Sequence, residues 1–287
     1  MPSCCPERLD RTTHHGSSHP GRLRASPAYD LTVPQIPPAY VLLHGGGTSS
    51  RFWDRLVPLL SLRALAVDLP GRAGKPFDPM TFTVAEGVAS ILDDVEAAGV
   101  GDVILVAHSS GGLFAPGVAA ALGARVRHIV LSAASVPPEG GFGLEAMKPS
   151  HRDRVIMGMD AARRDGWVLQ TPGPPEDPES ARESYGGDPL DDESLAFMLD
   201  PARCIRDSMN FYFQPVSWAP VAAVPVTYVK GLRDRPVSPD LQDEMLGRLP
   251  NPVEVIELDA GHVPAVTHPE QFAAILERIA AQEASPR

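Results

Sequence analysis

A serine stands at the turn between a predicted strand and a predicted helix. The segment Val103-Ile-Leu-Val-Ala-His-Ser-Ser-Gly-Gly112 runs from an apolar stretch into this serine, and helical spacing follows at once. Such a tight turn forces strained backbone angles on the serine. The second residue before it and the second residue after it must therefore be small. Ala107 and Gly111 meet this condition around Ser109. The pattern A-x-S-x-G predicts that Ser109 is a nucleophile; the alternative is a loop that binds phosphate at a helix N-terminus.

Two other strand ends carry the residues that a serine nucleophile requires. Asp234 follows the apolar stretch Val224–Lys230, and His262 follows Val253–Leu258. A serine hydroxyl is a poor nucleophile unless a histidine takes its proton, and the histidine needs an acid to fix its tautomer and stabilise its cation. Because the carboxyl ends of parallel strands meet at one edge of a sheet, we expect these residues to converge with Ser109 as a triad.

Other acids and histidines near strand ends are interpreted as structural. Asp259 stands three residues before His262 on the same strand end, too close to contact the far ring nitrogen. Asp68 follows another strand, where aspartate favours turns. His44 and His108 adjoin buried strands and are interpreted as hydrogen-bonding residues of the fold.

The glycine run after the first predicted strand supplies a candidate oxyanion hole. In Val41-Leu-Leu-His-Gly-Gly-Gly47, glycine lets the main chain approach a bound carbonyl without side-chain obstruction. The main-chain amide of Gly46 is the predicted first donor, and that of Ser110 is the second. Gly45 is expected to line the substrate site.

These candidates require a frame of alternating strands and helices. Short β-rich apolar stretches are predicted to be buried parallel strands: Ala39–Leu43, Arg63–Asp68, Val103–Ala107, Val126–Ser132, Val224–Lys230 and Val253–Leu258. Segments with helical spacing lie between them: Arg51–Leu60, Thr83–Ala98, Gly111–Leu122, Pro239–Leu249 and Pro269–Ala281. This alternation predicts an α/β fold, with a mostly parallel sheet and helices on both faces.

The alternation stops in residues 137–219, which we call the cap segment. It is rich in Pro, Gly, Asp, Glu and Arg, and a long insertion of this kind is expected to cover the sheet as a cap. The core is then predicted to comprise residues 39–136 and 220–287. Residues 1–38, rich in Pro, His, Ser and Arg, are predicted to be a disordered leader.

Apolar side chains in the cap segment have two interpretations. They could form a pocket wall for a substrate with a mainly apolar acyl or alcohol group, or they could be the cap's own small core. The residues concerned are Met157, Met159, Trp167, Phe197, Met198, Phe211, Tyr212, Phe213 and Trp218. Phe211 and Trp218, with Val263 beside His262, are the predicted substrate contacts.

Composition argues against several other classes of protein. The formal net charge of -11 disfavours binding to nucleic acid or to a membrane surface, and no stretch has the ~18 to 20 apolar residues that a membrane span needs. Cys4, Cys5 and Cys204 form no disulfide framework and no zinc-site spacing, and no metal or organic cofactor is expected. The N-terminus lacks the apolar region of a secretory signal, which predicts a cytoplasmic protein. Oligomeric state leaves no signal in the sequence.

From about residue 39 to residue 283 the chain resembles the α/β-hydrolase superfamily, on the strand-end motifs around His44, Ser109, Asp234 and His262. Further segments are similar to the branch of plant methylesterases, hydroxynitrile lyases and bacterial esterases: Asn210-Phe-Tyr-Phe213, Trp218-Ala219, Tyr228-Val229, Asp234-Arg235 with Gln242, and Gly261-His262 with Pro269-Glu270. The resemblance implies the α/β-hydrolase fold and hydrolysis of a small ester or lactone through an acyl-enzyme on Ser109.

Single residues argue for or against other activities found on this fold. Haloalkane dehalogenases and epoxide hydrolases attack through an aspartate, so Ser109 argues against both. Similar hydroxynitrile lyases would carry threonine and lysine where this chain has Gly45 and Val263, which disfavours lyase chemistry. Hydrolases of carbon–carbon bonds and cofactor-free perhydrolases use the same triad and stay open. So does a receptor that uses the pocket only for binding.

Overall fold

A parallel sheet runs through the computed structural model, which describes residues 38–171, 177–185, 190–250 and 252–283. Within these residues six strands pair in the order β2-β1-β3-β4-β5-β6, and every neighbouring pair is parallel. The strands are β1 Ala39–Leu43, β2 Ala64–Val67, β3 Val103–His108, β4 Val126–Ser132, β5 Val226–Gly231 and β6 Val253–Leu258. The six predicted strands are confirmed, with small shifts at their ends.

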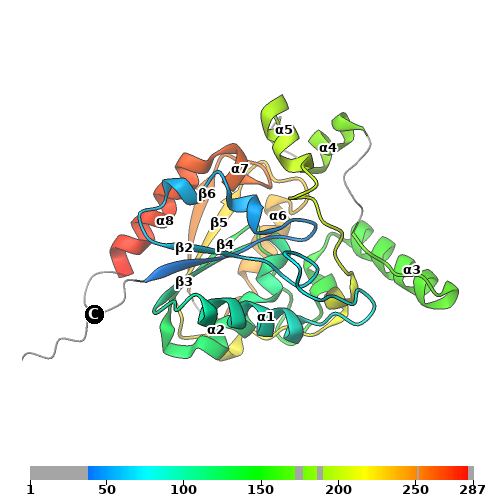
Figure 1. Cartoon of the computed structure of the whole chain (residues 1–287), viewed down its shortest axis with the longest axis horizontal. Helices are drawn as coiled ribbons and strands as arrows, with labels where there is room; N and C mark the ends of the chain where they lie inside the picture. The colour runs from blue at the N-terminus through cyan, green and yellow to red at the C-terminus, as the bar shows by residue number, and fades with distance from the viewer. Residues whose placement is uncertain (1–37, 172–176, 186–189, 251, 284–287) are drawn as a thin grey trace, which may run out of the picture. The chain divides into compact units, whose positions relative to one another are not determined.

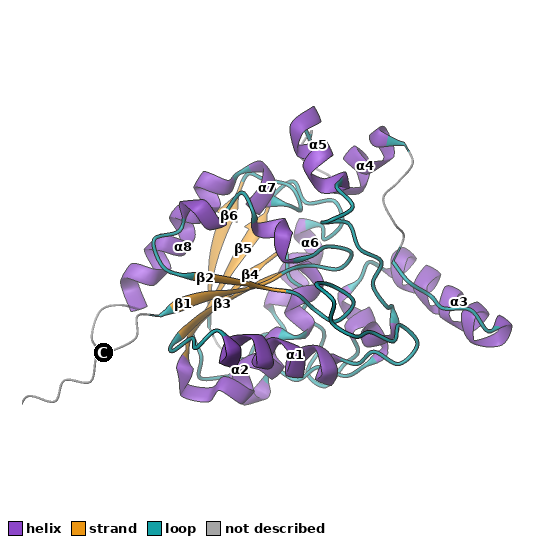
Figure 2. Ribbon diagram, viewed as in Figure 1, coloured by secondary structure: helices purple, strands orange, loops and turns teal. Residues whose placement is uncertain are grey.

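Helices cover both faces of this sheet (Figures 1 and 2). They are α1 Val84–Ala97, α2 Ala115–Leu122, α3 Pro149–Asp165, α4 Pro178–Tyr185, α5 Asp192–Leu199, α6 Pro239–Leu246, α7 Pro264–Thr267 and α8 Pro269–Glu283. Side chains of α1, α2 and α6 join one hydrophobic cluster, and those of α7 and α8 join the cluster on the other face. The predicted α/β architecture is confirmed; the short helix α7 and the cap-segment helices α3, α4 and α5 were not predicted.

Helix α1 illustrates how the sequence sets an element. Thr83 caps it, because its Oγ1 accepts a hydrogen bond from the N–H of Glu86 at 3.0 Å while the Glu86 carboxylate accepts one from the N–H of Thr83 at 2.7 Å. Ile91 and Val95 stand four residues apart, which places them on one apolar face of the helix, and both are fully buried. The helix therefore starts where its cap stands and packs along its apolar stripe.

The helix predicted over Arg51–Leu60 is wrong. That stretch forms two 3₁₀ turns, Ser50–Trp53 and Val57–Leu59. Pro58 lies inside the predicted helix, and proline lacks the N–H of a helical hydrogen bond and clashes with the preceding turn. The chain therefore continues as separate turns toward β2.

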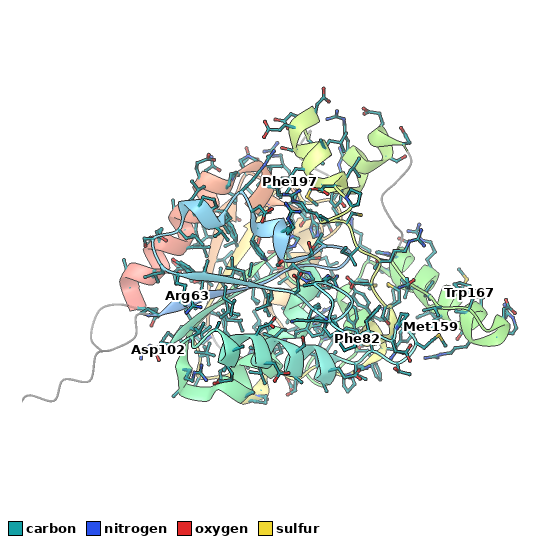
Figure 3. The ribbon with its side chains drawn as sticks, in the orientation of Figure 1. Arg63, Phe82, Asp102, Met159, Trp167 and Phe197 are labelled. Atoms are coloured by element: carbon teal, nitrogen blue, oxygen red, sulfur yellow. The ribbon has the colours of Figure 1, made fainter. Side chains whose placement is uncertain are left out.

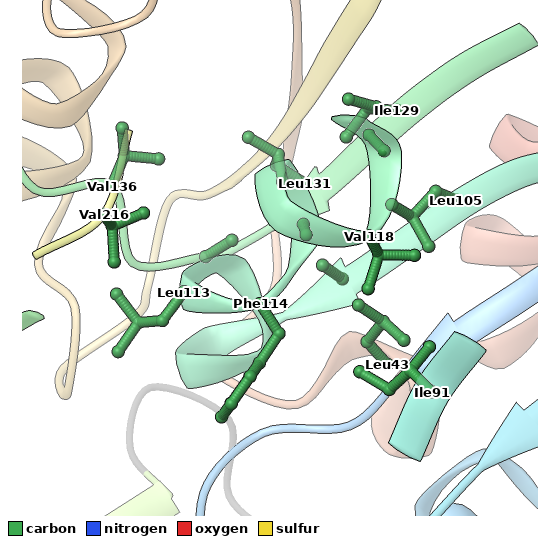
Figure 4. Packing of buried hydrophobic residues seen from close by; sticks show 14 of the residues in the cluster. Leu43, Ile91, Leu105, Leu113, Phe114, Val118, Ile129, Leu131, Val136 and Val216 are labelled. Carbon is green, nitrogen blue, oxygen red and sulfur yellow. The ribbon is translucent and has the colours of Figure 1, made fainter. Parts of the chain in front are cut away.

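The larger hydrophobic cluster lies between the sheet and the helices on the α1 and α2 face. Figure 4 shows Val118 of α2 beside Leu105 of β3 and Ile129 of β4, which belong to the same cluster. All three side chains are fully buried. This packing fixes α2 against β3, the strand that ends just before Ser109, so the serine is carried on a rigid support.

Cap-segment side chains pack into the two clusters of the sheet instead of a core of their own. Buried Met159, Phe211 and Trp218 belong to the cluster under α1 and α2, and Met198 belongs to the cluster under α7 and α8. The interpretation of these residues as a separate small core is therefore wrong. Others face solvent: Trp167, seen with Met159 at α3 in Figure 3, is 43% exposed.

Helix α5 is attached to the core around one aromatic ring. The guanidinium carbons of Arg55 and Arg203 lie 4.8 and 3.9 Å from the centroid of Phe197, which is labelled in Figure 3. Arg55 also donates to Ser194 Oγ at 2.8 Å and to the main-chain oxygen of Val266 at 3.0 Å. Arginine thus ties α5 to α7 as well as to the chain after β1.

The predicted leader, residues 1–38, lies outside the described residues except for Pro38. From Pro38 onward the described residues belong to one compact unit, so the predicted core and the cap segment are not separate bodies. Of the helices in the described residues, none has both the length and the apolar composition needed to cross a membrane.

Candidate active site

Ser109 occupies a strained turn directly after β3. Its φ is +50°, a left-handed conformation that non-glycine residues rarely adopt. A Cβ added to Gly111 would lie 2.8 Å from the main-chain oxygen of His44 and 2.9 Å from that of Leu43. The main-chain oxygen of Ser109 accepts a hydrogen bond from the N–H of Ser135 at 2.8 Å. The turn therefore needs glycine at position 111 and holds the serine in one orientation.

Asp234, after β5, and His262, after β6, meet Ser109 at the carboxyl edge of the sheet. The Nδ1–H of His262 donates to Asp234 Oδ2 at 2.8 Å, and His262 Nε2 lies 3.2 Å from Ser109 Oγ as acceptor of its proton. The other carboxylate oxygen of Asp234 accepts from the N–H of Val237 at 2.8 Å. Three predicted residues thus form one hydrogen-bonded chain with the distances that proton transfer requires.

His44 and His108 hydrogen-bond to the loops around these three residues. The Nε2–H of His108 donates to the main-chain oxygen of His262 at 2.7 Å, and the Nδ1–H of His44 donates to that of Gly45 at 2.8 Å. Burial lowers the pKa of His108 to about 3, with the nearby His262 adding to the effect. Burial and the charge of Arg72 keep the pKa of His44 well below its ordinary value. Both rings are neutral hydrogen-bonding residues, as predicted.

The rival acids have other partners. Asp259 Oδ1 lies 2.8 Å from Arg233 Nε, and this carboxylate is 80% exposed. Asp68 accepts from the N–H of Ser50 at 2.7 Å and from its hydroxyl at 2.8 Å. Asp68 thereby fixes the turn after β1 against the end of β2; its carboxylate has a structural role, but on the turn after β1 and not on the loop after its own strand.

The glycine loop after β1 lies against the serine turn. A Cβ on Gly45 would stand 2.9 Å from Ser109 Cβ, and one on Gly46 would stand 3.1 Å from Ser110 Oγ and 3.2 Å from the Tyr212 hydroxyl. The N–H of Gly46 donates no hydrogen bond to any residue that the structure describes. The two predicted amide donors, Gly46 and Ser110, are therefore on neighbouring segments beside Ser109.

The three apolar residues predicted to touch substrate are all buried. The Phe211 ring stacks on Tyr212 with centroids 4.4 Å apart. The main-chain N–H of Trp218 donates to Glu139 at 2.8 Å, and Val263 stands at the start of α7. Their contact with a substrate stays a prediction.

Three residues beside the glycine loop have contacts that sequence reasoning did not predict. Tyr212 was expected only as one of the apolar residues of the cap segment; burial raises its pKa to about 12, so the hydroxyl stays protonated, and Ser110 is its hydrogen-bond partner. The others are Arg72 and Asp207, which form a buried ion pair with atoms 2.6 Å apart. Arg72 follows the Leu69-Pro70-Gly71 turn and Asp207 lies in the cap segment, so no local pattern could have paired them. Among the described residues, no group of His, Cys, Asp or Glu is arranged to hold a metal ion.

The fold and this site define a class of protein. Residues 40–275 match the model of the Alpha/beta hydrolase family, which covers most of the chain. The chain therefore belongs to the alpha/beta hydrolase family, and the resemblance inferred from its motifs is confirmed.

Two proteins with sequences similar to this chain are esterases. Methylesterase 17 of Arabidopsis thaliana is 28% identical over 253 residues, covering 84% of this chain and 90% of the relative. A pimeloyl acyl-carrier protein methyl ester esterase of Aeromonas hydrophila subsp. hydrophila is 27% identical over 270 residues, covering 84% and 94%. An extracellular alpha/beta-hydrolase from a Paenibacillus species superposes with a TM-score of 0.69 at 17% identity, covering 84% and 98%, and shares the fold. The likenesses to the two esterases support ester hydrolysis in general terms.

Proposed function

We propose that the protein is a serine hydrolase that cleaves a carboxylic ester or lactone through an acyl-enzyme on Ser109. The observation that carries this proposal is the hydrogen-bonded chain from Ser109 through His262 to the buried Asp234. The two curated relatives, each named as an esterase of a methyl ester or a methylesterase, support it. No metal or organic cofactor is required by this chemistry.

In the first half of the reaction, Ser109 Oγ attacks the substrate carbonyl while its proton passes to His262 Nε2. Asp234 stabilises the imidazolium that results and keeps Nδ1 protonated. The tetrahedral intermediate collapses when the ester bond breaks and His262 returns its proton to the alkoxy leaving group. In a lactone this leaving group stays attached to the acyl chain.

In the second half, a water molecule attacks the acyl carbonyl and gives its proton to His262. The bond to Ser109 Oγ then breaks, the serine regains its proton, and a carboxylic acid leaves. We assign the amides of Gly46 and Ser110 to the negative oxygen that forms in both halves, because the two segments adjoin Ser109.

The substrate is proposed to be a small, mainly apolar ester, enclosed by the cap segment. Gly45, Phe211, Trp218 and Val263 are the proposed contacts; the last three are buried apolar side chains, and Val263 directly follows His262 in the chain. The net charge of -11 makes a polyanionic partner such as nucleic acid unfavourable.

A substrate panel tests the proposal. Aryl and alkyl esters, lactones and thioesters are assayed with the parent and with Ser109→Ala, and Ser90→Ala on α1 serves as the matched serine control. We expect ester turnover that Ser109→Ala removes and Ser90→Ala keeps. No turnover in the whole panel, or turnover independent of Ser109, would contradict the proposal and favour a binding protein.

A further inference from the structure

A buried ion pair lies directly behind the glycine loop. Arg72 follows β2, and Asp207 belongs to the cap segment between α5 and the 3₁₀ turn Asn210–Phe213. Their atoms Nη2 and Oδ1 are 2.6 Å apart, and the side chains are 2% and 3% exposed. Charges so fully removed from water are stable only when they are paired and hydrogen-bonded. The other hydrogen bonds of Arg72 and Asp207 therefore show which segment the pair holds in place.

Both members bind the main chain immediately after Gly46. Asp207 Oδ2 accepts a hydrogen bond from the N–H of Gly47 at 2.6 Å, and Arg72 Nε donates to the main-chain oxygen of Thr48 at 2.5 Å. The cap segment adds a third bond, because the N–H of Ile205 donates to the oxygen of Gly47 at 2.8 Å. Gly47 is thus held on both its donor and its acceptor side, and Thr48 is held on its acceptor side.

The glycine loop needs such an external support. Gly45, Gly46 and Gly47 have no side chains to pack, and glycine has more backbone freedom than any other residue. Gly47 has a φ of +72°, a left-handed conformation. An amide that stabilises a developing oxyanion must point at it before reaction, because reorientation during reaction costs rate. Fixing the next two residues limits how the Gly46 amide can rotate.

We propose that Arg72 and Asp207 are positioning residues that aim the Gly46 amide at the reacting oxygen. The inference rests on the proposed function, since it assigns a task to an oxyanion hole. It gives the cap segment a part in catalysis beyond lining a pocket: the cap segment supplies the carboxylate that orders the loop. Neither side chain touches substrate in this assignment.

The test measures how fast a fluorophosphonate labels Ser109, a reaction that needs no knowledge of the substrate. Ser109 Oγ attacks phosphorus, fluoride leaves, His262 takes the serine proton, and the phosphoryl oxygen occupies the oxyanion hole. Asp207→Asn keeps the size of the side chain but removes its charge. We expect labelling to slow by roughly tenfold to a hundredfold, the usual result of misplacing a reacting group by about 1 Å.

Asp94→Asn is the matched control. Asp94 pairs with Lys75 at 2.6 Å, and Lys75 also donates to a main-chain oxygen of the chain after β2, that of Asp68, at 2.5 Å. This variant breaks an ion pair of the same length that does not contact the glycine loop. It should label Ser109 at the parent rate. Equal slowing in both variants would overturn the proposal.

A double variant separates positioning from stability. Asp207→Asn leaves Arg72 without its charge partner, which by itself destabilises a fold. Arg72→Met together with Asp207→Leu removes both charges and fills the space, so its thermal unfolding midpoint should return toward that of the parent. In this double variant the labelling of Ser109 should stay slower than in the parent. Hydrogen exchange at the main-chain amides of residues 45–48 should be faster than in the parent. Recovery of the labelling rate along with stability would reduce the pair to a structural role and overturn the inference.

The two proposals fail in different ways. If the fluorophosphonate does not label the parent at Ser109, the proposed function fails and the inference falls with it. If the parent is labelled and Asp207→Asn is labelled equally fast, only the positioning role is lost.

Discussion

The Nε2–H of His108 donates a hydrogen bond to the main-chain oxygen of His262 over 2.7 Å. His108 ends β3 immediately before the serine turn, so this bond joins the strand of Ser109 to the loop of the histidine. The His108 ring also stacks on Phe52, with centroids 4.7 Å apart. A buried neutral imidazole thus links two segments whose strands are not neighbours in the sheet.

This burial predicts a loss of stability in acid. The pKa of His108 falls from 6.5 to about 3 on folding, so below pH 6.5 the unfolded chain binds a proton that the folded chain does not. The contribution of the neutral His108 ring to the free energy of unfolding is at its full value above pH 6.5. This contribution is lost as the pH falls toward 3. His108→Gln should reduce the pH slope of the unfolding free energy between pH 6 and 4 by about 1.4 kcal/mol per unit.

Urea unfolding of the parent and His108→Gln at several pH values measures this slope. His268→Gln is a useful comparison, because His268 is only partly buried. Identical slopes for parent and His108→Gln would show that His108 contributes nothing to acid destabilisation.

Replacing the acid of the triad should remove most activity without unfolding the protein. In Asp234→Asn the amide can keep a hydrogen bond to His262 but favours the wrong imidazole tautomer and cannot stabilise the cation. We expect kcat to fall by roughly 10³-fold or more on any ester that the parent cleaves. Asp259→Asn, at the exposed rival acid, should keep the parent kcat. The opposite ranking of the two variants would reassign the acid.

A methyl group on the glycine loop should disturb the oxyanion hole. In Gly46→Ala the new Cβ would lie 3.1 Å from Ser110 Oγ and 3.2 Å from the Tyr212 hydroxyl, so one of them must move. We expect kcat to fall on the order of tenfold while KM changes little. Adding Tyr212→Phe removes one contact and should restore part of the rate. Additive losses in the double variant would argue against this steric explanation.

Gly111, two residues after the nucleophile, is predicted to be needed for full stability. In Gly111→Ala a Cβ would meet two main-chain oxygens at 2.8 and 2.9 Å, and main chain cannot move aside as a side-chain tip can. Overpacking of this kind costs about 1–3 kcal/mol or more in unfolding free energy. Gly247→Ala, whose Cβ would lie 3.5 Å from its nearest neighbour, is the control. Equal urea midpoints for both variants would show that the turn tolerates a side chain.

Local sequence patterns determined the frame and the placement of the triad. The apolar stretches predicted all six strands, and because parallel strands end at one edge, the residues after β3, β5 and β6 had to meet there. Small residues around Ser109 predicted its strained turn, which its φ of +50° shows. The helix predicted over Arg51–Leu60 does not form. That prediction rested on the spacing of apolar residues alone, but Pro58 interrupts the hydrogen bonds of a helix.

Only the tertiary structure decided which distant segments touch. Nothing near Arg72 or Asp207 in the sequence indicates that they form a buried pair behind the glycine loop, or that Tyr212 lies beside Ser110. Periodicity and turn chemistry act over a few residues, so they can be interpreted from short stretches. A contact between remote segments depends on how every packed element sits against the others, and no short stretch contains that information.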